Sequence, residues 1–210
     1  MKKIRLGVLC LIIGGVIAVR ILYVNRGISY PPVQEYAMGE DVPLENNIMT
    51  DDYENMMGYS VAVNEAVILS YDEFLKKYHY SEKTDGQLFQ KDELTYPEMV
   101  YDLKVVIKNN NTEDFEDRGI DFRMYRLTAL DFQLQISDTL YAVANPSMEN
   151  GEMTFRLLPK DEMEFHLPFY FTPSSPLEPI KTEELQNTNL CLPVCYFPEQ
   201  KQICIKETSH

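Results

Sequence analysis

Apolar and polar residues alternate with a period of two along two long stretches of the chain. In residues 99–108 every second residue is apolar, and 163–171 repeats this alternation with Pro168 in its second half. A period of two over this length predicts β-strands that bury one face. Pro168 lacks a backbone N–H and therefore favours an edge strand or a bulge. We expect the apolar faces of the two strands to meet across the interior of a β-sandwich, with His166 pointing outward to solvent.

Shorter stretches of the same character predict the remaining strands. These are 59–69, 120–124, 132–136, 140–143, 153–157 and a closing hairpin of 190–197 and 202–205. A capping box at Ser70 and Glu73 predicts a short helix over 72–78, and 182–186 is a candidate for another. About seven to nine short strands with little helix indicate an all-β protein with an immunoglobulin-like antiparallel β-sandwich.

The first 26 residues follow a different pattern. Three basic residues lie within the first five positions, and the apolar run Leu6–Val24 that follows contains a single charge, Arg20. As a helix this run would measure about 28 Å, close to the roughly 30 Å of a bilayer's hydrocarbon core. Because flanking positive charges stay in the cytoplasm, we predict an uncleaved signal anchor, a single transmembrane helix over 1–26, with the rest of the chain outside the membrane. A cleaved secretory signal and a buried structural helix remain alternatives.

Two further segments complete the expected organisation. Residues 27–57 contain several prolines, Gly39 and an acidic polar stretch, and they keep neither a helical nor a strand period. We therefore predict an acidic flexible stalk over 27–57 and one β-sandwich domain over 58–210. About 150 residues are enough for a single domain with a sizeable core.

The distribution of charge limits the possible partners. The formal net charge is −14, and all five charged residues within 1–26 are basic, so the remainder carries −19. A domain this acidic repels phosphate groups, which argues against nucleic-acid binding. We expect contact with the membrane through the N-terminal helix, and with a protein or the cell-wall matrix outside it.

The cysteines near the C-terminus give the most specific structural prediction. If residues 198–201 form the turn of the closing hairpin, Cys195 lies directly opposite Cys204. Opposed residues of antiparallel strands have Cα atoms about 4.5–5.5 Å apart, within the range of about 4.4–6.8 Å that disulfides need. We therefore predict a possible Cys195–Cys204 disulfide and a free Cys191, with three small buried hydrophobic side chains as the alternative. The spacing of the three cysteines does not match a zinc site.

Few residues point to chemistry. Tyr78, Tyr80 and Tyr96 flank the one long polar loop and are the candidate ligand-binding residues, because aromatic faces stack on sugar rings. The carboxylates between Glu113 and Asp121 are oxygen ligands of the kind that calcium takes, without the spacing of an EF-hand. The three histidines are scattered, and no serine or cysteine lies in a nucleophile motif. We therefore predict no catalytic residue, no metal and no cofactor.

Three stretches of the chain resemble a known family. They are 59–66, 103–110 and 158–169, the last of which combines a proline, a polar turn and a long strand. With the N-terminal apolar segment, they make the chain similar to the telokin-like, immunoglobulin-type β-sandwiches of uncharacterised Gram-positive membrane-anchored surface proteins. This resemblance implies the fold and a bacterial cell-surface location, and it supplies no catalytic residue.

These expectations favour a non-enzymatic surface module: a single-pass anchor, a stalk, and one extracytoplasmic β-sandwich that binds a protein or the cell wall. The alternative is a carbohydrate- or peptide-binding module that uses the loop aromatics. An extracellular hydrolase is the third interpretation, and it would need two carboxylates that face each other in a cleft.

Overall fold

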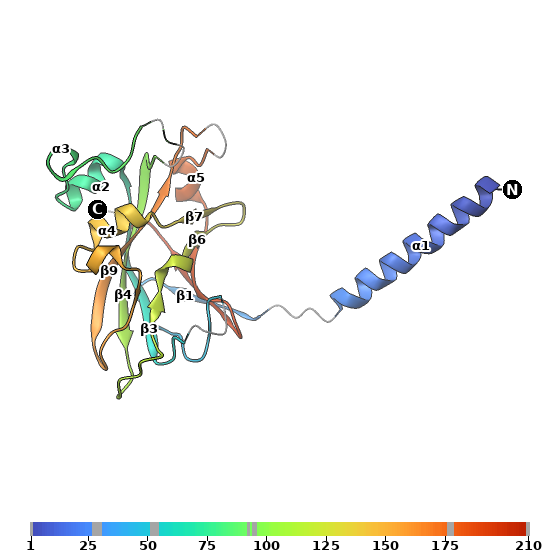
Figure 1. Ribbon diagram of the computed structural model, residues 1–210, viewed down its shortest axis with the longest axis horizontal. Helices are drawn as coiled ribbons and strands as arrows, with labels where there is room; N and C mark the ends of the chain where they lie inside the picture. The colour runs from blue at the N-terminus through green and yellow to red at the C-terminus, as the bar shows by residue number, and fades with distance from the viewer. Residues whose placement is uncertain are drawn as a thin grey trace. The chain divides into compact units, whose positions relative to one another are not determined.

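The computed structural model describes residues 2–26, 31–50, 55–91, 93, 96–175 and 179–208; the side chains of residues 2–12 and of Asn150 lie outside this description. The chain forms two compact units, Met1–Pro31 and Pro32–His210 (Figure 1). The first unit contains helix α1, Lys2–Asn25. The predicted anchor begins in the part whose side chains are not described. Among the residues that the structure describes, no helix is both long and apolar enough for a membrane span.

Two main sheets and one small sheet build the second unit. The first sheet has the strand order β1-β11-β10-β6-β7, the second β2-β3-β4-β9, and the small one β5-β8. The strands are β1 Val33–Ala37, β2 Val42–Pro43, β3 Tyr59–Ser70, β4 Met99–Asn109, β5 Ile120–Asp121, β6 Arg126–Thr128, β7 Gln133–Gln135, β8 Thr154–Phe155, β9 Glu162–Phe171, β10 Leu190–Cys195 and β11 Gln200–Ile205. Side chains from both main sheets share one buried core, which confirms a β-rich, sandwich-like fold. The expected antiparallel pairing fails at β1, which runs parallel to β11.

Short helices join the strands. They are α2 Tyr71–Lys77, α3 Glu82–Asp85, α4 Asp138–Ala144 and α5 Thr182–Asn187, with 3-10 turns at Phe122–Met124 and Glu149–Gly151. The capping box before α2 is present: the Ser70 hydroxyl accepts from the N–H of Glu73, and the Glu73 carboxylate accepts from the N–H of Ser70. The helix predicted over 182–186 is confirmed as α5.

One predicted strand, 140–143, is helical instead. Ser137 caps helix α4 by accepting a hydrogen bond from the N–H of Leu140, which is fully buried. Four residues are too few to distinguish a period of 2 from a period of 3.6, and the serine cap favours the helix. The strand predicted over 120–124 is shorter than expected, because a 3-10 turn begins at Phe122.

Strands β3, β4 and β9 dominate the second sheet. Leu103 pairs with Leu167 and Val105 with Phe165, and all four side chains are fully buried. β4 and β9 are therefore neighbours that share an inner face, whereas the sequence predicted that they face each other across the core. Matching alternation is compatible with both arrangements, so the pattern alone could not separate them. The edge position of β9 agrees with the prediction made from Pro168.

Most of the predicted stalk belongs to the folded unit. Strand β1 pairs with β11, and β2 pairs with β3. The buried Lys201 ammonium, on β11, donates hydrogen bonds to the Pro43 carbonyl and to the Glu45 carboxylate at 2.6 Å each. Strands of two and five residues are too short to show a period, which is why the pattern missed them. Residues 27–30 and 51–54 lie outside the described residues.

The closing hairpin is present with a different register. Cys191, not Cys195, lies opposite Cys204, and a bulge between Pro193 and Cys195 sets Cys195 against Lys201. The turn, 196–199, lies two residues earlier than the predicted 198–201, because β10 ends at Cys195 and β11 begins at Gln200. The predicted opposition of Cys195 and Cys204 is therefore wrong, and Cys195 is fully buried in the core.

Candidate functional site

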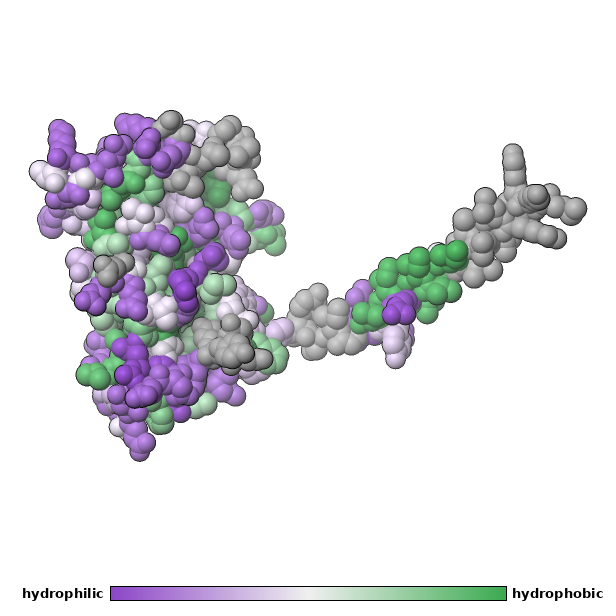
Figure 2. All heavy atoms as spheres, viewed as in Figure 1, coloured by the Kyte–Doolittle hydropathy of each residue, from purple (hydrophilic) through white to green (hydrophobic). Residues whose placement is uncertain are grey.

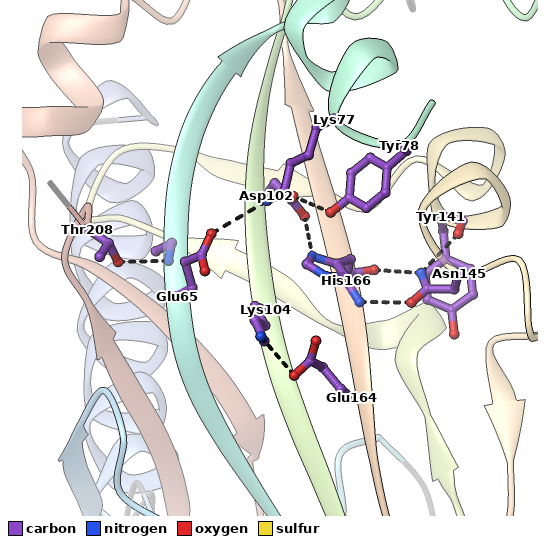
Figure 3. Close-up of polar contacts among 11 residues, drawn as sticks. Glu65, Lys77, Tyr78, Asp102, Lys104, Tyr141, Asn145, Glu164, His166 and Thr208 are labelled. Carbon is purple, nitrogen blue, oxygen red and sulfur yellow. Dashed lines mark hydrogen bonds and ion pairs between the residues drawn. The ribbon is translucent and has the colours of Figure 1, made fainter. Parts of the chain in front are cut away.

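A polar cluster lies on the outer face of the second sheet, away from the main core (Figure 3). We call it the Asp102 cluster, and its members are Lys77, Tyr78, Asp102, Asn145 and His166. Strand β4 supplies Asp102 and β9 supplies His166. Helix α2 and its C-cap supply Lys77 and Tyr78, and the C-cap of α4 supplies Asn145. Five side chains from four elements thus meet at one point of the sheet.

An apolar layer holds helix α2 over this point. Phe74 and Leu75 are buried with Val100 in a small second core, separate from the main one. Residues four apart share one side of a helix, so Tyr78 follows Phe74, and their ring centroids lie 4.7 Å apart. The last turn of α2 therefore brings Lys77 and Tyr78 onto the outer face of β4.

Asp102 forms the centre of the cluster, and its carboxylate is fully buried. Its Oδ2 atom accepts hydrogen bonds from Lys77 Nζ at 2.9 Å and from the Tyr78 hydroxyl at 2.5 Å. Its Oδ1 atom lies 3.4 Å from His166 Nδ1, at ion-pair distance but without hydrogen-bond geometry. Burial raises the pKa of a carboxyl group, yet the three neighbouring groups outweigh this effect and hold the pKa of Asp102 below its usual value. The cluster therefore contains a carboxylate that is ionised at neutral pH.

Asn145 attaches helix α4 to the free edge of β9. Its Oδ1 atom accepts from the backbone N–H of His166, and its Nδ2 atom donates to the carbonyl of the same residue, both at 2.8 Å. The Asn145 amide thus makes the hydrogen bonds that a neighbouring strand would make to the backbone of His166. Pro168 lies at the same edge of β9 and has no backbone N–H that would need a partner. His166, predicted to point into solvent, is largely covered, with 18% of its side chain exposed.

A histidine beside a buried carboxylate is an arrangement that enzymes use for general-base catalysis. Here the Tyr78 hydroxyl is bound to Asp102, and its ring packs edge-on against His166 with centroids 5.1 Å apart. Burial and the Asp102 charge raise the pKa of Tyr78, so its hydroxyl stays protonated. Among the described residues, no hydroxyl or thiol forms a hydrogen bond with the imidazole. The geometry therefore fits a clamp that holds two helices on the sheet.

The three tyrosines predicted to bind a ligand lie together at the rim of this region. Tyr78, Tyr80 and Tyr96 are all half-buried against the small second core. The Tyr80 hydroxyl donates to the carbonyl of Gly86 at 2.9 Å, and Tyr96 packs edge-on against Tyr71 with centroids 5.4 Å apart. Each tyrosine thus uses its ring or its hydroxyl within the fold. Their predicted role in ligand binding stays a prediction.

A second candidate is an open cavity of about 570 Å³ beside the small β5–β8 sheet. We call it the arginine cavity, because Arg118, Arg123 and Arg156 line it together with carboxylates that include Asp121 and Glu152. The antiparallel pairing of β5 with β8 brings the two lining segments together. The cavity therefore presents charges of both signs on a fixed scaffold.

Some of these charges are paired with one another. Arg123 forms a forked contact with Asp121, in which Nε lies 2.9 Å from Oδ1 and Nη2 lies 2.5 Å from Oδ2. Burial raises the pKa of Asp121, but the hydrogen bonds and charge of Arg123 hold this pKa below its usual value. Arg156 lies 3.3 Å from Asp114. Both arginines reach solvent, with 66% of the Arg123 side chain and 38% of the Arg156 side chain exposed, so they can also contact a partner.

Arg118 is more buried than the other two arginines of the cavity. Its guanidinium lies over the Phe115 ring at 3.6 Å and donates to the Asn111 side chain at 2.6 Å. The Arg118 Nε atom is buried and has no hydrogen-bond acceptor among the described residues. Stacking on an aromatic ring and a fixed hydrogen bond orient the cation before any ligand arrives.

Residues 33–201 match the model of a family described as a domain of unknown function, DUF5028. The chain belongs to the DUF5028 family. Comparisons with curated proteins and with solved structures give no match. The matched segment begins at the first residue of β1 and ends at the second residue of β11, so it covers both main sheets except for the last four residues of β11. The resemblance to telokin-like surface proteins stays a prediction.

In the DUF5028 domain, the acidic turn has partners that the sequence prediction missed. This turn, 113–121, suggested calcium ligands, but the structure pairs Asp114 and Asp121 with arginines. Within the described part of the domain, no three His, Cys, Asp or Glu side chains are grouped as a metal site requires. The sequence contains one indication of this pairing, because Arg118 lies within the acidic run and Arg123 lies just after it.

Proposed function

We propose that the protein is a membrane-anchored β-sandwich module that lies outside the membrane and binds a protein or cell-wall partner without catalysing a reaction. The proposal extends the resemblance to telokin-like, immunoglobulin-type surface proteins of Gram-positive bacteria. In this proposal the membrane is contacted through helix α1, and the second partner is contacted by the DUF5028 domain.

Two features of helix α1 support its proposed role as a membrane anchor. Basic residues precede its apolar run in the sequence. The large apolar side chains between Ile13 and Val24 each expose half or more of their surface, and Figure 2 shows the apolar surface that they form. A helix that is apolar around its circumference needs an apolar environment. The hydrocarbon core of a bilayer supplies one.

The arginine cavity is the observation that carries the binding proposal. It combines cationic and anionic side chains with Met124, whose side chain is 43% exposed. A cavity with both signs of charge is complementary to a ligand that carries both, such as a peptide or a peptide-bearing cell-wall polymer. The Asp102 cluster is less suited to this role, because its central carboxylate is buried and already compensated.

Location is tested by protease treatment of intact cells that express the full-length chain with a tag at each end. We expect the protease to remove the chain beyond about residue 30, while the N-terminal tag stays protected. Permeabilised cells are the control, and both tags should be lost there. A protected C-terminal domain in intact cells whose wall admits the protease would contradict the proposed location.

Binding is tested with a photoreactive amino acid placed at Met124 of the full-length chain. The matched variant carries the same group at Leu130, which is 95% exposed in the β6–β7 turn. We expect an envelope partner to be crosslinked from Met124 and not from Leu130, with a lower yield in the Arg123→Ala and Arg156→Ala backgrounds. The Asp102→Asn background should leave the yield unchanged. Equal or stronger crosslinking from Leu130 would contradict the assignment to the arginine cavity.

A further inference from the structure

Two thiols face each other on the outer face of the first sheet. Cys191 and Cys204 are directly paired residues of the antiparallel strands β10 and β11, and their sulfur atoms lie 3.8 Å apart. Their neighbours Leu192 and Ile203 are fully buried in the main core. Alternation along a strand therefore places both cysteines on the opposite side. Both are half-buried.

This placement satisfies the geometric requirement for a disulfide. Directly opposed residues of antiparallel strands have Cα atoms about 4.5–5.5 Å apart, inside the range of about 4.4–6.8 Å in which disulfides form. We propose that Cys191 and Cys204 form a reversible disulfide by exchange with an external low-molecular-weight disulfide. Cys195 takes no part, because the bulge in β10 places it opposite Lys201 and it is fully buried.

Open space next to the pair gives an exchange partner access. Cys191 and Cys204 both line a cavity of about 660 Å³ that also borders α5 and the end of β11. Cys204 additionally lines a smaller groove of about 400 Å³ beside β1. Cys204 can therefore be reached from two sides, and Cys191 from one.

The exchange takes place in two balanced steps. The Cys204 thiolate attacks one sulfur of the external disulfide, which forms a mixed disulfide and releases one external thiolate that takes up a proton. Cys191 then gives up its proton and its sulfur attacks the Cys204 sulfur, which forms the Cys191–Cys204 bond and releases the second external thiol. Two cysteine thiols are oxidised, and one external disulfide is reduced to two thiols.

The order of attack follows from the surroundings of the two thiols. Burial and the neighbouring Cys204 raise the pKa of the Cys191 thiol to about 12. Because the thiolate is the nucleophile, Cys191 is a poor first attacker at neutral pH. Cys204, which borders both open spaces, therefore reacts first, and Cys191 resolves the mixed disulfide from its position opposite.

The bond would stabilise the β10–β11 hairpin beside β1. Strand β11 lies between β10 and β1, and Ala37 of β1 is paired with Cys204. A Cys191–Cys204 bond closes a loop around the hairpin turn and restricts the unfolded chain. Oxidation thus fixes the hairpin on which β1 packs. This inference does not rest on the proposed binding function.

The pairing is tested on the full-length chain, purified in the reduced state and incubated with oxidised glutathione. Peptide mapping under non-reducing conditions should find one Cys191–Cys204 linked peptide, and the Tm should rise by about 5–10 °C, reversibly on reduction. Cys195→Ala is the matched control and should keep the link. A Cys195–Cys204 link, or the absence of any link between β10 and β11, would overturn the proposal.

The order is tested with single-thiol variants under the same conditions. Cys191→Ser should accumulate one glutathione on Cys204, whereas Cys204→Ser should be modified at Cys191 about tenfold more slowly. Equal rates in the two variants would contradict the assigned order. Failure of both variants to react would contradict access from outside.

Discussion

On its inner face, strand β4 presents Leu103, Val105 and Ile107, which are fully buried in the main core. On its outer face, it presents Asp102 and Lys104 from the same stretch of the chain. The Asp102 side chain is as deeply buried as Leu103, whereas Lys104 keeps 30% of its side chain exposed. The inner face of β4 is therefore shielded from solvent along its length, whereas the outer face is shielded only beneath α2 and α4.

The two faces hold their residues by different means. Apolar burial is non-directional, and each Å² of apolar surface removed from water contributes about 25 cal/mol whatever its exact partner. A buried charge is stabilised only when each polar atom finds a partner, because desolvation costs several kcal/mol per ion. The inner face should thus tolerate exchange among apolar side chains of similar volume, while the Asp102 cluster should respond to loss of a single partner.

The largest effect is expected on the inner face. Phe165 packs against the rings of Phe122 and Phe155, with centroids 5.2 and 4.4 Å away. Phe165→Ala removes these contacts and leaves a cavity, so the free energy of unfolding should fall by about 3–5 kcal/mol in a urea melt. The neighbouring change on the outer face, His166→Ala, should cost only about 1–2 kcal/mol, because it removes one of several partners of Asp102. Equal losses would contradict the difference between the faces.

On the outer face, Asp102→Ala should have the strongest effect. It leaves the Tyr78 hydroxyl and the Lys77 ammonium without their shared acceptor. The Lys77 side chain is 31% exposed, so its ammonium can turn to water when Asp102 is removed. The free energy of unfolding should therefore fall by about 3 kcal/mol, the lower end of the range for a broken buried ion pair. The control Asp131→Ala, in an exposed turn, should stay within about 0.5 kcal/mol. A loss at Asp102 as small as that of the control would contradict its role in the clamp.

The same carboxylate makes stability depend on pH in a definite direction. Because the pKa of Asp102 is lowered in the folded protein, its contribution is complete above the unfolded-state value of about 3.9 and is lost as the pH falls through the folded value. The difference in unfolding free energy between the wild type and Asp102→Asn should therefore be large at pH 7 and shrink below about pH 4. A difference that grows on acidification would mean that the folded protein holds Asp102 protonated.

The inner face is the part that the sequence predicts well. A period of two located β4 and β9 and identified which of their residues point inward, because one-sided burial imposes that period, while a short alternation followed by an apolar run located β3. The pattern contains no information on which strands are neighbours, so β4 and β9 were expected on opposite sides of the core. Strands β1 and β2 were missed because they are short. The register of the closing hairpin was wrong because its turn lies two residues earlier than the predicted 198–201, and the bulge near Cys195 shifts the pairing by one further residue.

The sequence partly predicts that a helix covers the outer face of β4. Val100 lies on the polar side of β4, next to Asp102, and the capping box predicts a helix whose apolar side includes Phe74. An apolar helix side needs an apolar partner, and Val100 provides one. The meeting of Asp102 with His166 and Asn145 could not be predicted, because these residues come from separate elements that only tertiary packing brings together.

A smaller effect is expected at the edge of the covered face. Asn145→Ala removes the side-chain hydrogen bonds to the backbone of His166 and should cost about 1–2 kcal/mol in a urea melt. Amide hydrogen exchange at His166 should become faster than in the wild type. Asn187→Ala is the matched control, since the exposed Asn187 amide bonds only the Glu183 carbonyl among the described residues. Unchanged exchange at His166 would contradict the role of Asn145 as a substitute strand.

The smallest effect on the free energy of unfolding is expected at the solvent-exposed end of the same face. There an ion pair has the same length as the Lys77–Asp102 pair but differs from it in burial. Lys104 Nζ lies 2.9 Å from Glu164, the same distance that separates Lys77 Nζ from Asp102. Since Glu164 is 49% exposed, water and salt screen this pair, and Lys104→Ala should change the unfolding free energy by no more than about 0.5 kcal/mol. Double-mutant cycles should therefore give a much larger coupling for Lys77 with Asp102 than for Lys104 with Glu164. Equal couplings in the two cycles would mean that α2 and α4 do not exclude water from the outer face.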